Sequence, residues 1–145
     1  MKIEPKIIDT SQCLSRNSSD IKYIVIQEFK NGTPSHYQIA NGKVYQMIPD
    51  KKTSDAINGP KISSKGKFHG ICTKYNCISI SIDKAPSKED TEIINHLIMT
   101  IRQRYKINLS NVLRQTDVTG EMSPEIWYDN SRWDRDVISK LNDMR

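Results

Sequence analysis

Two stretches of the sequence have the apolar patterns of β-strands. Residues 21–26 are apolar at nearly every position and rich in β-branched side chains, which predicts a central strand covered on both faces. Residues 77–83 alternate instead, with isoleucine at every second position, and this alternation predicts a strand with a single apolar face. The chain is therefore expected to contain a sheet.

A β-hairpin is predicted around Asn41-Gly42. The strand-like runs 36–40 and 43–48 flank this dipeptide, and both of its residues readily adopt the positive φ angles that a tight hairpin turn needs. Two shorter runs, 6–8 and 112–115, are predicted as additional short strands.

A long helix is predicted to begin after Ser87, its N-cap, and to continue through Arg104. Asp90 stands where a capping box usually has Glu or Gln. The apolar residues that recur at helical spacing in this segment are Ile93, Ile94, Leu97, Ile98, Ile101 and Tyr105. Asn130 or Ser131 is expected to cap a last helix. The apolar residues of that helix are Trp133, Val137, Ile138 and Leu141.

The remaining stretches lack periodicity and are predicted as irregular structure. Residues 49–76 form a long loop, and loops of this length inside a domain are often functional. Residues 116–129 form a second loop. Residues 1–19 are polar and rich in serine, and are expected to form an N-terminal arm that precedes one domain, residues 20–145. The order of elements predicts an α/β fold in which a central mixed sheet of five or six strands is flanked by two or three helices, with the long loop over one edge.

Length and composition fit one ordinary globular domain. The chain has 145 residues, of which 36% are hydrophobic, and a chain of this size forms a core without covalent staples. No apolar run reaches the length of a membrane span. Residues 1–6 have no apolar segment of the kind that a secretory signal contains, so a cytoplasmic location is expected. The three cysteines are odd in number and are expected to be reduced thiols.

The net charge of +5 favours an anionic partner. Nucleic acid is not expected, because the basic residues are not interleaved with stacking aromatic residues and no nucleic-acid-binding motif is present. Lysines crowd the long loop, where they suit either solvent or an anionic polymer of a bacterial wall: Lys51, Lys52, Lys61, Lys65, Lys67 and Lys74.

Four blocks of the sequence together resemble the zinc-dependent N-acetylmuramoyl-L-alanine amidases of phage endolysins and bacterial autolysins, whose fold is shared with peptidoglycan recognition proteins. The blocks are residues 21–27, 35–37 together with 42–46, 76–83, and 111–124. They keep the order and spacing of that family from about residue 20 to the C-terminus, whereas the long loop is shorter and matches poorly. The resemblance implies the α/β fold predicted above and a site for catalytic zinc.

The sequence departs from this family at every implied ligand of zinc. Gln27 and Gln115 stand where the family has histidines, and Ser123 stands where it has the ligand, a Cys or Asp, before a proline. Glu121 replaces a helper lysine, and Asp83 replaces a helper glutamate. The surrounding residues that match the family are Arg114, Asp117, Val118, Thr119, Gly120 and Pro124.

These replacements predict that zinc has been lost while the fold is kept. Zinc is bound by thiolate, imidazole or carboxylate groups, and two neutral amides with a hydroxyl supply none of these. We therefore expect no cofactor, no metal and no catalytic residue, with Asp83 and Glu121 as degenerate positions. Taken singly, the replaced residues are also explained as ordinary polar residues at strand ends.

The leading prediction of function is a catalytically inactive amidase homologue, derived from a phage or prophage endolysin, that binds peptidoglycan or muropeptide. Its cleft would use Gln27, His36, Gln115 and Ser123 as hydrogen-bonding groups, although His36 is equally explained as a packed histidine. One alternative is an accessory protein that acts through its surface to release or regulate another protein. Others are an active wall amidase with atypical ligands and a protein without function. Endolysins commonly reach the wall through a holin or lysis.

Overall fold

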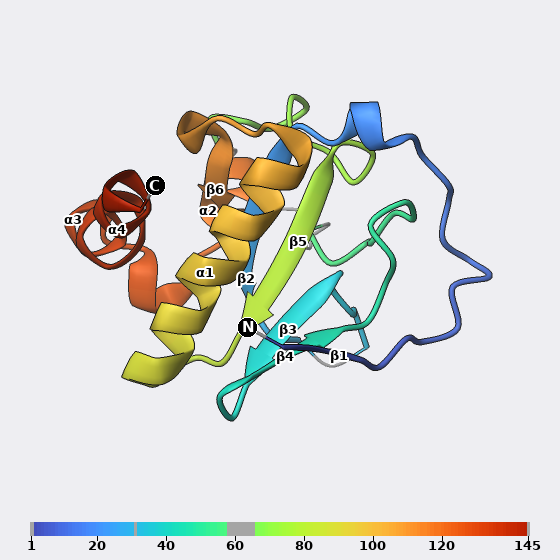
Figure 1. Cartoon of the computed structure of the whole chain (residues 1–145). Coiled ribbons are helices and arrows are strands. Elements are labelled where there is room, and N and C mark those ends of the chain that lie inside the picture. The colour runs from blue at the N-terminus through green and yellow to red at the C-terminus, as the bar shows by residue number, and fades with distance from the viewer. Residues whose placement is uncertain (1, 31, 58–65, 145) are drawn as a thin grey trace.

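The computed structural model describes residues 2–30, 32–57 and 66–144, and it contains a mixed sheet of six strands in the order β1-β4-β3-β5-β2-β6. The α/β fold with a central mixed sheet flanked by helices is therefore confirmed (Figure 1). The strands are β1 (Ile3–Pro5), β2 (Tyr23–Glu28), β3 (Tyr37–Ala40), β4 (Lys43–Gln46), β5 (Cys77–Ile82) and β6 (Val112–Arg114). The first short strand was predicted at residues 6–8 and instead ends at Pro5.

The centre of the sheet is parallel. β2 pairs in parallel with both β5 and β6, and β3 pairs in parallel with β5. The prediction that β2 is covered on both faces is confirmed, because Ile24 to Gln27 are all buried. The prediction of a single apolar face for β5 is confirmed, because Ile78, Ile80 and Ile82 join the main core. The second face is nevertheless covered, since all six residues of the strand are buried. The serines on its second face are satisfied by hydrogen bonds, which an alternation of apolar and polar residues does not reveal.

The predicted hairpin of β3 and β4 is confirmed, and the turn is tied to the long helix. Asn41 and Gly42 have φ angles of 55° and 72°. The Gly42 amide donates to Asp90 Oδ1 at 2.9 Å. Ser87 caps the helix by accepting from the Asp90 amide at 3.0 Å. The carboxylate of Asp90 thus binds the hairpin rather than completing the predicted capping box.

Helix α1 (Lys88–Tyr105) covers one face of the sheet (Figure 1). Its buried apolar residues join those of the strands in the main core. They are Ile94, Leu97, Ile98 and Ile101. Short helical turns lie before β2 at η1 (Ser18–Asp20) and after α1 at η2 (Leu109–Asn111) and η3 (Glu125–Trp127).

The C-terminal helical segment consists of α3 (Asn130–Trp133), a π-helical stretch η4 (Asp134–Ile138) and α4 (Ser139–Asp143). Its N-cap is Asp129, which accepts from the Ser131 amide at 2.8 Å, and not Asn130 or Ser131 as predicted. Trp127 and Trp133 lie with ring centroids 5.8 Å apart and anchor this segment to the main core.

Loops and a short helix cover the other face of the sheet. Helix α2 (Gln115–Thr119) begins at the last residue of the predicted strand 112–115 and continues into the stretch 116–129, which was predicted as a loop. A second apolar cluster on this face joins both strands and loops. Its buried members are Val25, Ile57, Cys72, Cys77, Leu113 and Val118. The described parts of the long loop therefore lie across a face of the sheet, where an edge had been expected. None of the described helices combines the length and apolar character that a membrane span requires.

Candidate functional site

Gln27, Gln115 and Ser123 meet at one corner of the sheet. Strands β2 and β6 run in parallel with Ile26 opposite Arg114, so the next residue of each chain segment, Gln27 and Gln115, lies at the same level. The Ser123 Oγ accepts a hydrogen bond of 3.0 Å from the Glu28 amide. The three positions that the resemblance identifies as former zinc ligands are thus brought together from β2, the start of α2 and the following loop.

The side chains at this corner are enclosed. Gln27 and Gln115 are 0% exposed and Ser123 is 4% exposed. Gln27 Nε2 donates to the Ala56 carbonyl at 3.1 Å. Gln27 Oε1 and both polar atoms of the Gln115 amide have no hydrogen-bond partner among the described residues. A buried amide atom without a hydrogen-bond partner destabilises the folded protein by about 1–3 kcal/mol. These three atoms can therefore form additional hydrogen bonds.

Arg114 fixes the junction between β6 and α2. Its backbone amide donates to Asp117 Oδ2 at 2.8 Å, and its Nη2 donates to Asp117 Oδ1 at 3.0 Å. Its Nη1 donates to the Trp127 carbonyl at 2.8 Å, and the guanidinium lies 5.5 Å from the centroid of Trp133. These contacts fix the start of α2 at Gln115, whose side chain is buried.

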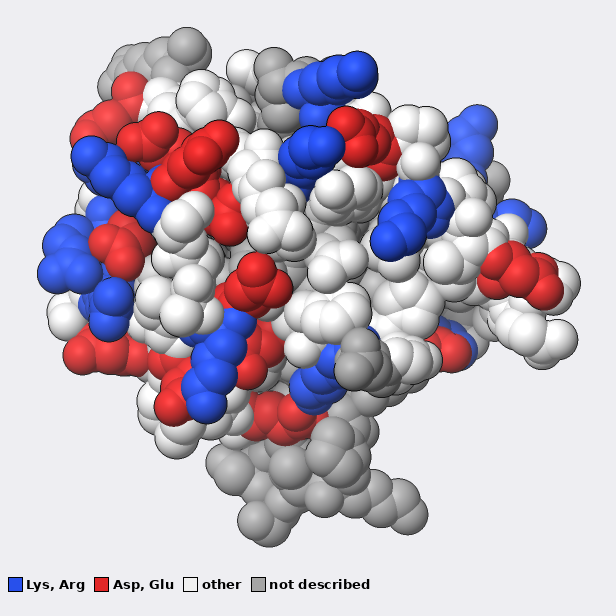
Figure 2. Space-filling view, turned by 90° about the horizontal axis from the view of Figure 1, so that it is seen from below, with Lys and Arg blue, Asp and Glu red and all other residues white. Residues whose placement is uncertain are grey.

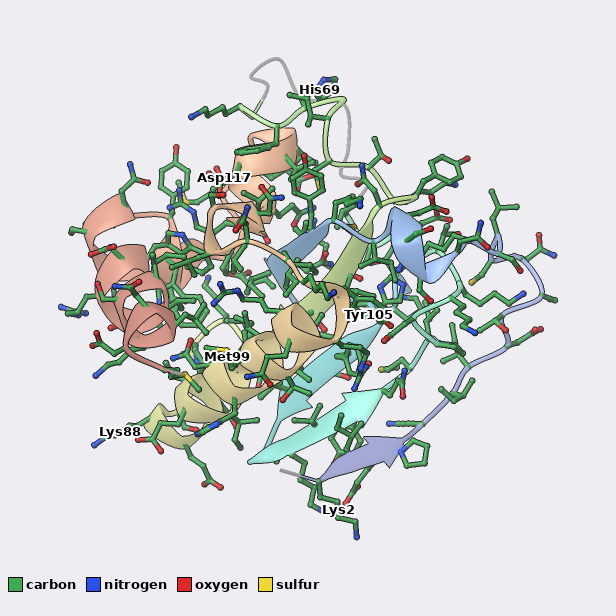
Figure 3. The ribbon with its side chains drawn as sticks, turned by 45° about the horizontal axis from the view of Figure 1, so that its top comes forward. Lys2, His69, Lys88, Met99, Tyr105 and Asp117 are labelled. Atoms are coloured by element: carbon green, nitrogen blue, oxygen red, sulfur yellow. The ribbon has the colours of Figure 1, made fainter. Side chains whose placement is uncertain are left out.

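The chain on either side of residues 58–65 passes over the corner. Ala56 accepts from Gln27, and the Phe68 amide donates to the Asp117 carbonyl at 2.8 Å. Gly66 lies so close to α2 that a Cβ placed on it would clash with the carbonyl group of Asp117. His69 and Asp117 accordingly lie on the same side of the molecule in Figure 3. Sequence reasoning missed this cover, because residues 49–57 have no periodic pattern.

His36 lies inside the protein and is 0% exposed, so of the two interpretations that the sequence left open, cleft wall or packed histidine, the packed histidine is confirmed. The Ser79 amide donates to Nδ1 at 3.0 Å, so Nε2 carries the ring proton and donates to the Lys52 carbonyl at 2.7 Å. Burial, and secondarily the charge of Arg16, lower the pKa of His36 to about 4. His36 is therefore a neutral, packed histidine with both ring nitrogens engaged.

The two degenerate helper positions have separate surroundings. Asp83 is exposed directly after β5. Glu121 lies near the corner, where its Oε2 accepts from Lys30 Nζ at 2.8 Å. Its other oxygen, Oε1, is buried without a partner among the described residues. Neither carboxylate belongs to a group of three potential metal ligands within the described part of the chain.

The side chains at the corner do not fit zinc. A catalytic zinc site uses three ligands drawn from imidazole, thiolate and carboxylate groups. The corner offers two amides, of which Gln27 already donates to a backbone carbonyl, and a hydroxyl that already accepts from a backbone amide. Neither charge nor a basic nitrogen is available at these three positions.

Comparison with solved structures identifies proteins with the same fold. A mutant of PlyL has a TM-score of 0.76 at 18% identity, covering 99% of each chain. The catalytic domain of XlyA has a TM-score of 0.73 at 17% identity, covering 97% of this chain and 99% of that one. The N-acetylmuramoyl-L-alanine amidase LysC from Clostridium intestinale URNW has a TM-score of 0.68 at 15% identity, covering 98% of each.

These neighbours confirm the amidase-like fold that the four sequence blocks indicated. A further neighbour, the hydrolase AmiA of Staphylococcus aureus, was solved in complex with its ligand and has a TM-score of 0.59 at 11% identity, covering 81% of this chain and 66% of that one. No family model matches the sequence, and no curated protein matches it. At these identities the likeness concerns the fold alone.

Proposed function

We propose that the protein is a non-catalytic amidase-fold protein that binds peptidoglycan fragments without hydrolysing them. The observation that carries this proposal is the meeting of Gln27, Gln115 and Ser123 at one corner of the sheet with side chains that do not suit zinc. The fold supports a relation to cell-wall amidases. The replaced side chains support the loss of amide hydrolysis in this protein.

The chemistry of amide hydrolysis explains why these replacements abolish turnover. A zinc ion polarises the scissile carbonyl and lowers the pKa of its bound water from about 15.7 to about 7. Neutral amides and a hydroxyl group do not hold a zinc ion, and without the ion no water molecule is deprotonated to hydroxide at neutral pH. Of the two degenerate helper positions, Asp83 and Glu121, Glu121 lies beside the corner, and its carboxylate is already paired with Lys30.

Binding, unlike hydrolysis, remains within the chemistry of the corner. A peptide amide presents one donor and one acceptor, and the unpaired amide atoms of Gln27 and Gln115 offer both complementary groups. Phe29 follows Gln27 by two positions and Met122 directly precedes Ser123, and their side chains are 41% and 59% exposed. Polar groups flanked by apolar side chains are typical of a small binding site. Direct contact with the glutamines requires the cover near Ala56 to move, because both are fully buried.

The proposal is tested by incubating the full chain with purified peptidoglycan and measuring two quantities. We expect no release of soluble peptides above a protein-free blank, and retention of the protein in the sedimented wall. Phe29→Ser and Met122→Ser should each reduce retention, whereas Tyr128→Ser is the matched control at a surface residue of similar exposure, 47%. Release of peptides would contradict the loss of activity, and absence of retention would contradict binding.

A second candidate function is that of an accessory protein which uses its surface rather than the corner. The observation that favours it is the complete enclosure of Gln27 and Gln115 beside the exposed Phe29 and Met122. In that case a protein partner should depend on Phe29 and Met122 and be indifferent to Gln27→Ala and Gln115→Ala, while wall retention is absent.

A further inference from the structure

A cavity of about 660 Å³ lies at the end of the sheet where β2 and β5 begin. It is formed where η1 and the segment before β5 come together at that end of the sheet (Figure 1). Gln27 lies near the other end of β2, so this cavity is separate from the corner described above. Its lining includes the charged residues Arg16, Asp20 and Lys22, together with Ser19, Tyr75 and Asn76.

Hydrogen bonds hold the walls of the cavity in place. The Lys22 amide donates to the Asn76 carbonyl at 2.8 Å. Asn76 Nδ2 donates to the Ile71 carbonyl at 2.9 Å, and the Thr73 amide donates to Asn76 Oδ1 at 2.8 Å. Arg16 ties the N-terminal arm to the same region, since its Nη1 donates to the Cys77 carbonyl at 2.6 Å. The cavity is thus preformed rather than a gap between loose segments.

The cavity has an excess of positive charge. Arg16 donates to the Asp50, Lys74 and Cys77 carbonyls, and its Nη2 lies 3.1 Å from Nε2 of the neutral His36. Neither Arg16 nor Lys22 makes an ion pair among the described residues. The one acid that lines the cavity, Asp20, already accepts from the Asn17 amide at 3.1 Å. Among the residues that line the cavity, two cations therefore stand against one engaged carboxylate, and a bound anion would balance the charge of Lys22.

The other lining groups suit a hydroxylated ligand. The Tyr75 side chain is 52% exposed and offers an aromatic surface beside hydroxyl and amide groups. Aromatic faces pack against C–H surfaces of sugars and polyols, while serine and asparagine side chains exchange hydrogen bonds with hydroxyl groups. By contrast, on the side of the molecule toward which β2 and β5 run, acidic and basic side chains are intermixed (Figure 2).

We propose that this cavity binds a phosphorylated polyol or sugar, with Lys22 facing the phosphate, the charge of the anchored Arg16 behind it and Tyr75 packing against the carbon skeleton. This chemistry is that of a repeating unit of an anionic, hydroxyl-rich polymer. The site would hold the protein to such a polymer independently of the peptide-binding corner.

The test uses the isotope-labelled full chain and glycerol 1-phosphate as the probe, with amide chemical shifts as the readout. We expect saturable shifts at residues of the cavity, such as Lys22 and Tyr75, and at least fivefold weaker binding in Lys22→Gln and in Tyr75→Ser. Lys88→Gln is the matched control for charge, because Lys88 is exposed at the far end of α1 from Tyr105 (Figure 3). Arg16 is left unchanged because it anchors three carbonyls.

Glycerol and inorganic phosphate form two separate arms of this titration. Weaker binding of both than of glycerol 1-phosphate supports the proposal. Equal binding of inorganic phosphate would reduce the cavity to a simple anion site and overturn it, as would equal binding of glycerol. Absence of saturable shifts, or the same loss in Lys88→Gln as in Lys22→Gln, would also overturn it. Because the probe contains no peptide, failure here is independent of the peptidoglycan experiment.

Discussion

Gln115 has the most unusual surroundings of any single residue at the corner. Its side chain is fully buried between β6 and α2, yet neither amide atom has a partner among the described residues. Gln27 differs, because its Nε2 donates to the Ala56 carbonyl. This difference between two otherwise similar glutamines leads to opposite expectations for the same substitution.

Replacing Gln115 by methionine should leave the free energy of unfolding nearly unchanged or raise it. Methionine has a similar shape and removes two buried polar atoms that are unsatisfied. Gln27→Met should lower the free energy of unfolding by about 1–3 kcal/mol, because the buried Ala56 carbonyl loses its donor. Urea denaturation of both variants measures these values. A loss of more than about 2 kcal/mol in Gln115→Met would show that its amide is bonded in the folded protein.

His36 makes the stability of the protein dependent on pH. Its pKa is about 4 in the folded chain and about 6.5 in the unfolded chain. The stabilisation from keeping this ring neutral is therefore complete above about pH 6.5 and is lost as the pH falls from there toward 4, because only the unfolded chain then takes up the proton. The difference corresponds to about 3 kcal/mol.

Urea midpoints between pH 7.5 and 4 should fall more steeply for the native chain than for His36→Gln. The variant retains the other two histidines, so they serve as an internal control. Parallel pH profiles of the two proteins would contradict the assignment of this acid sensitivity to His36.

At the scale of secondary structure, the β3–β4 hairpin and α1 support one another through Gly42. Its amide binds Asp90, its φ is 72°, and a Cβ at this position would lie 2.7 Å from Glu89 Oε1. Gly32 has a similar φ of 82° but nothing within 4 Å of the added carbon. The two glycines therefore separate backbone strain from the contact between hairpin and helix.

We expect Gly32→Ala to lower the free energy of unfolding by about 1–2 kcal/mol through strain in the left-handed region. Gly42→Ala should lower it further, since the Glu89 side chain must also move. Thermal or urea denaturation of the two variants gives the comparison. Equal losses of unfolding free energy in the two variants would mean that the close approach of Glu89 to position 42 does not affect stability.

The sequence predicted the elements whose signals are local. The apolar run of β2, the Asn41-Gly42 turn and the helical spacing of α1 each sufficed to place an element. Helix α2 was missed although its Arg114–Asp117 contacts join residues only three positions apart, so the acidic residue at the third position of the helix was a local signal that could have placed it. The second buried face of β5 was missed because it depends on a distant segment, since Ser79 is satisfied by His36.

For the candidate site, the resemblance identified which positions belong together, and their meeting follows from the parallel register of β2 and β6. The enclosure of Gln27 could not be predicted, because it depends on where Ala56 lies in a loop without periodicity. The sequence left open whether His36 lines the cleft or packs in the interior, because its partner Lys52 also belongs to that loop.

At the scale of the whole molecule, an amidase-like fold carries different chemistry at the two ends of its central strands. One end has the enclosed amide corner of Gln27 and Gln115, and the other has a preformed cavity with Arg16, Lys22 and Tyr75. We interpret the molecule as a protein that binds wall components. The residues at the positions of the zinc ligands, Gln27, Gln115 and Ser123, do not support hydrolysis.

The zinc content of the purified full chain tests this interpretation most directly. After incubation with zinc and dialysis, elemental analysis should find no stoichiometric metal. The triple variant Gln27→His, Gln115→His and Ser123→Cys, which restores the side chains implied by the resemblance, should retain zinc and serves as the positive control. One zinc retained per native chain, and lost on Gln27→Ala or Gln115→Ala, would contradict the interpretation.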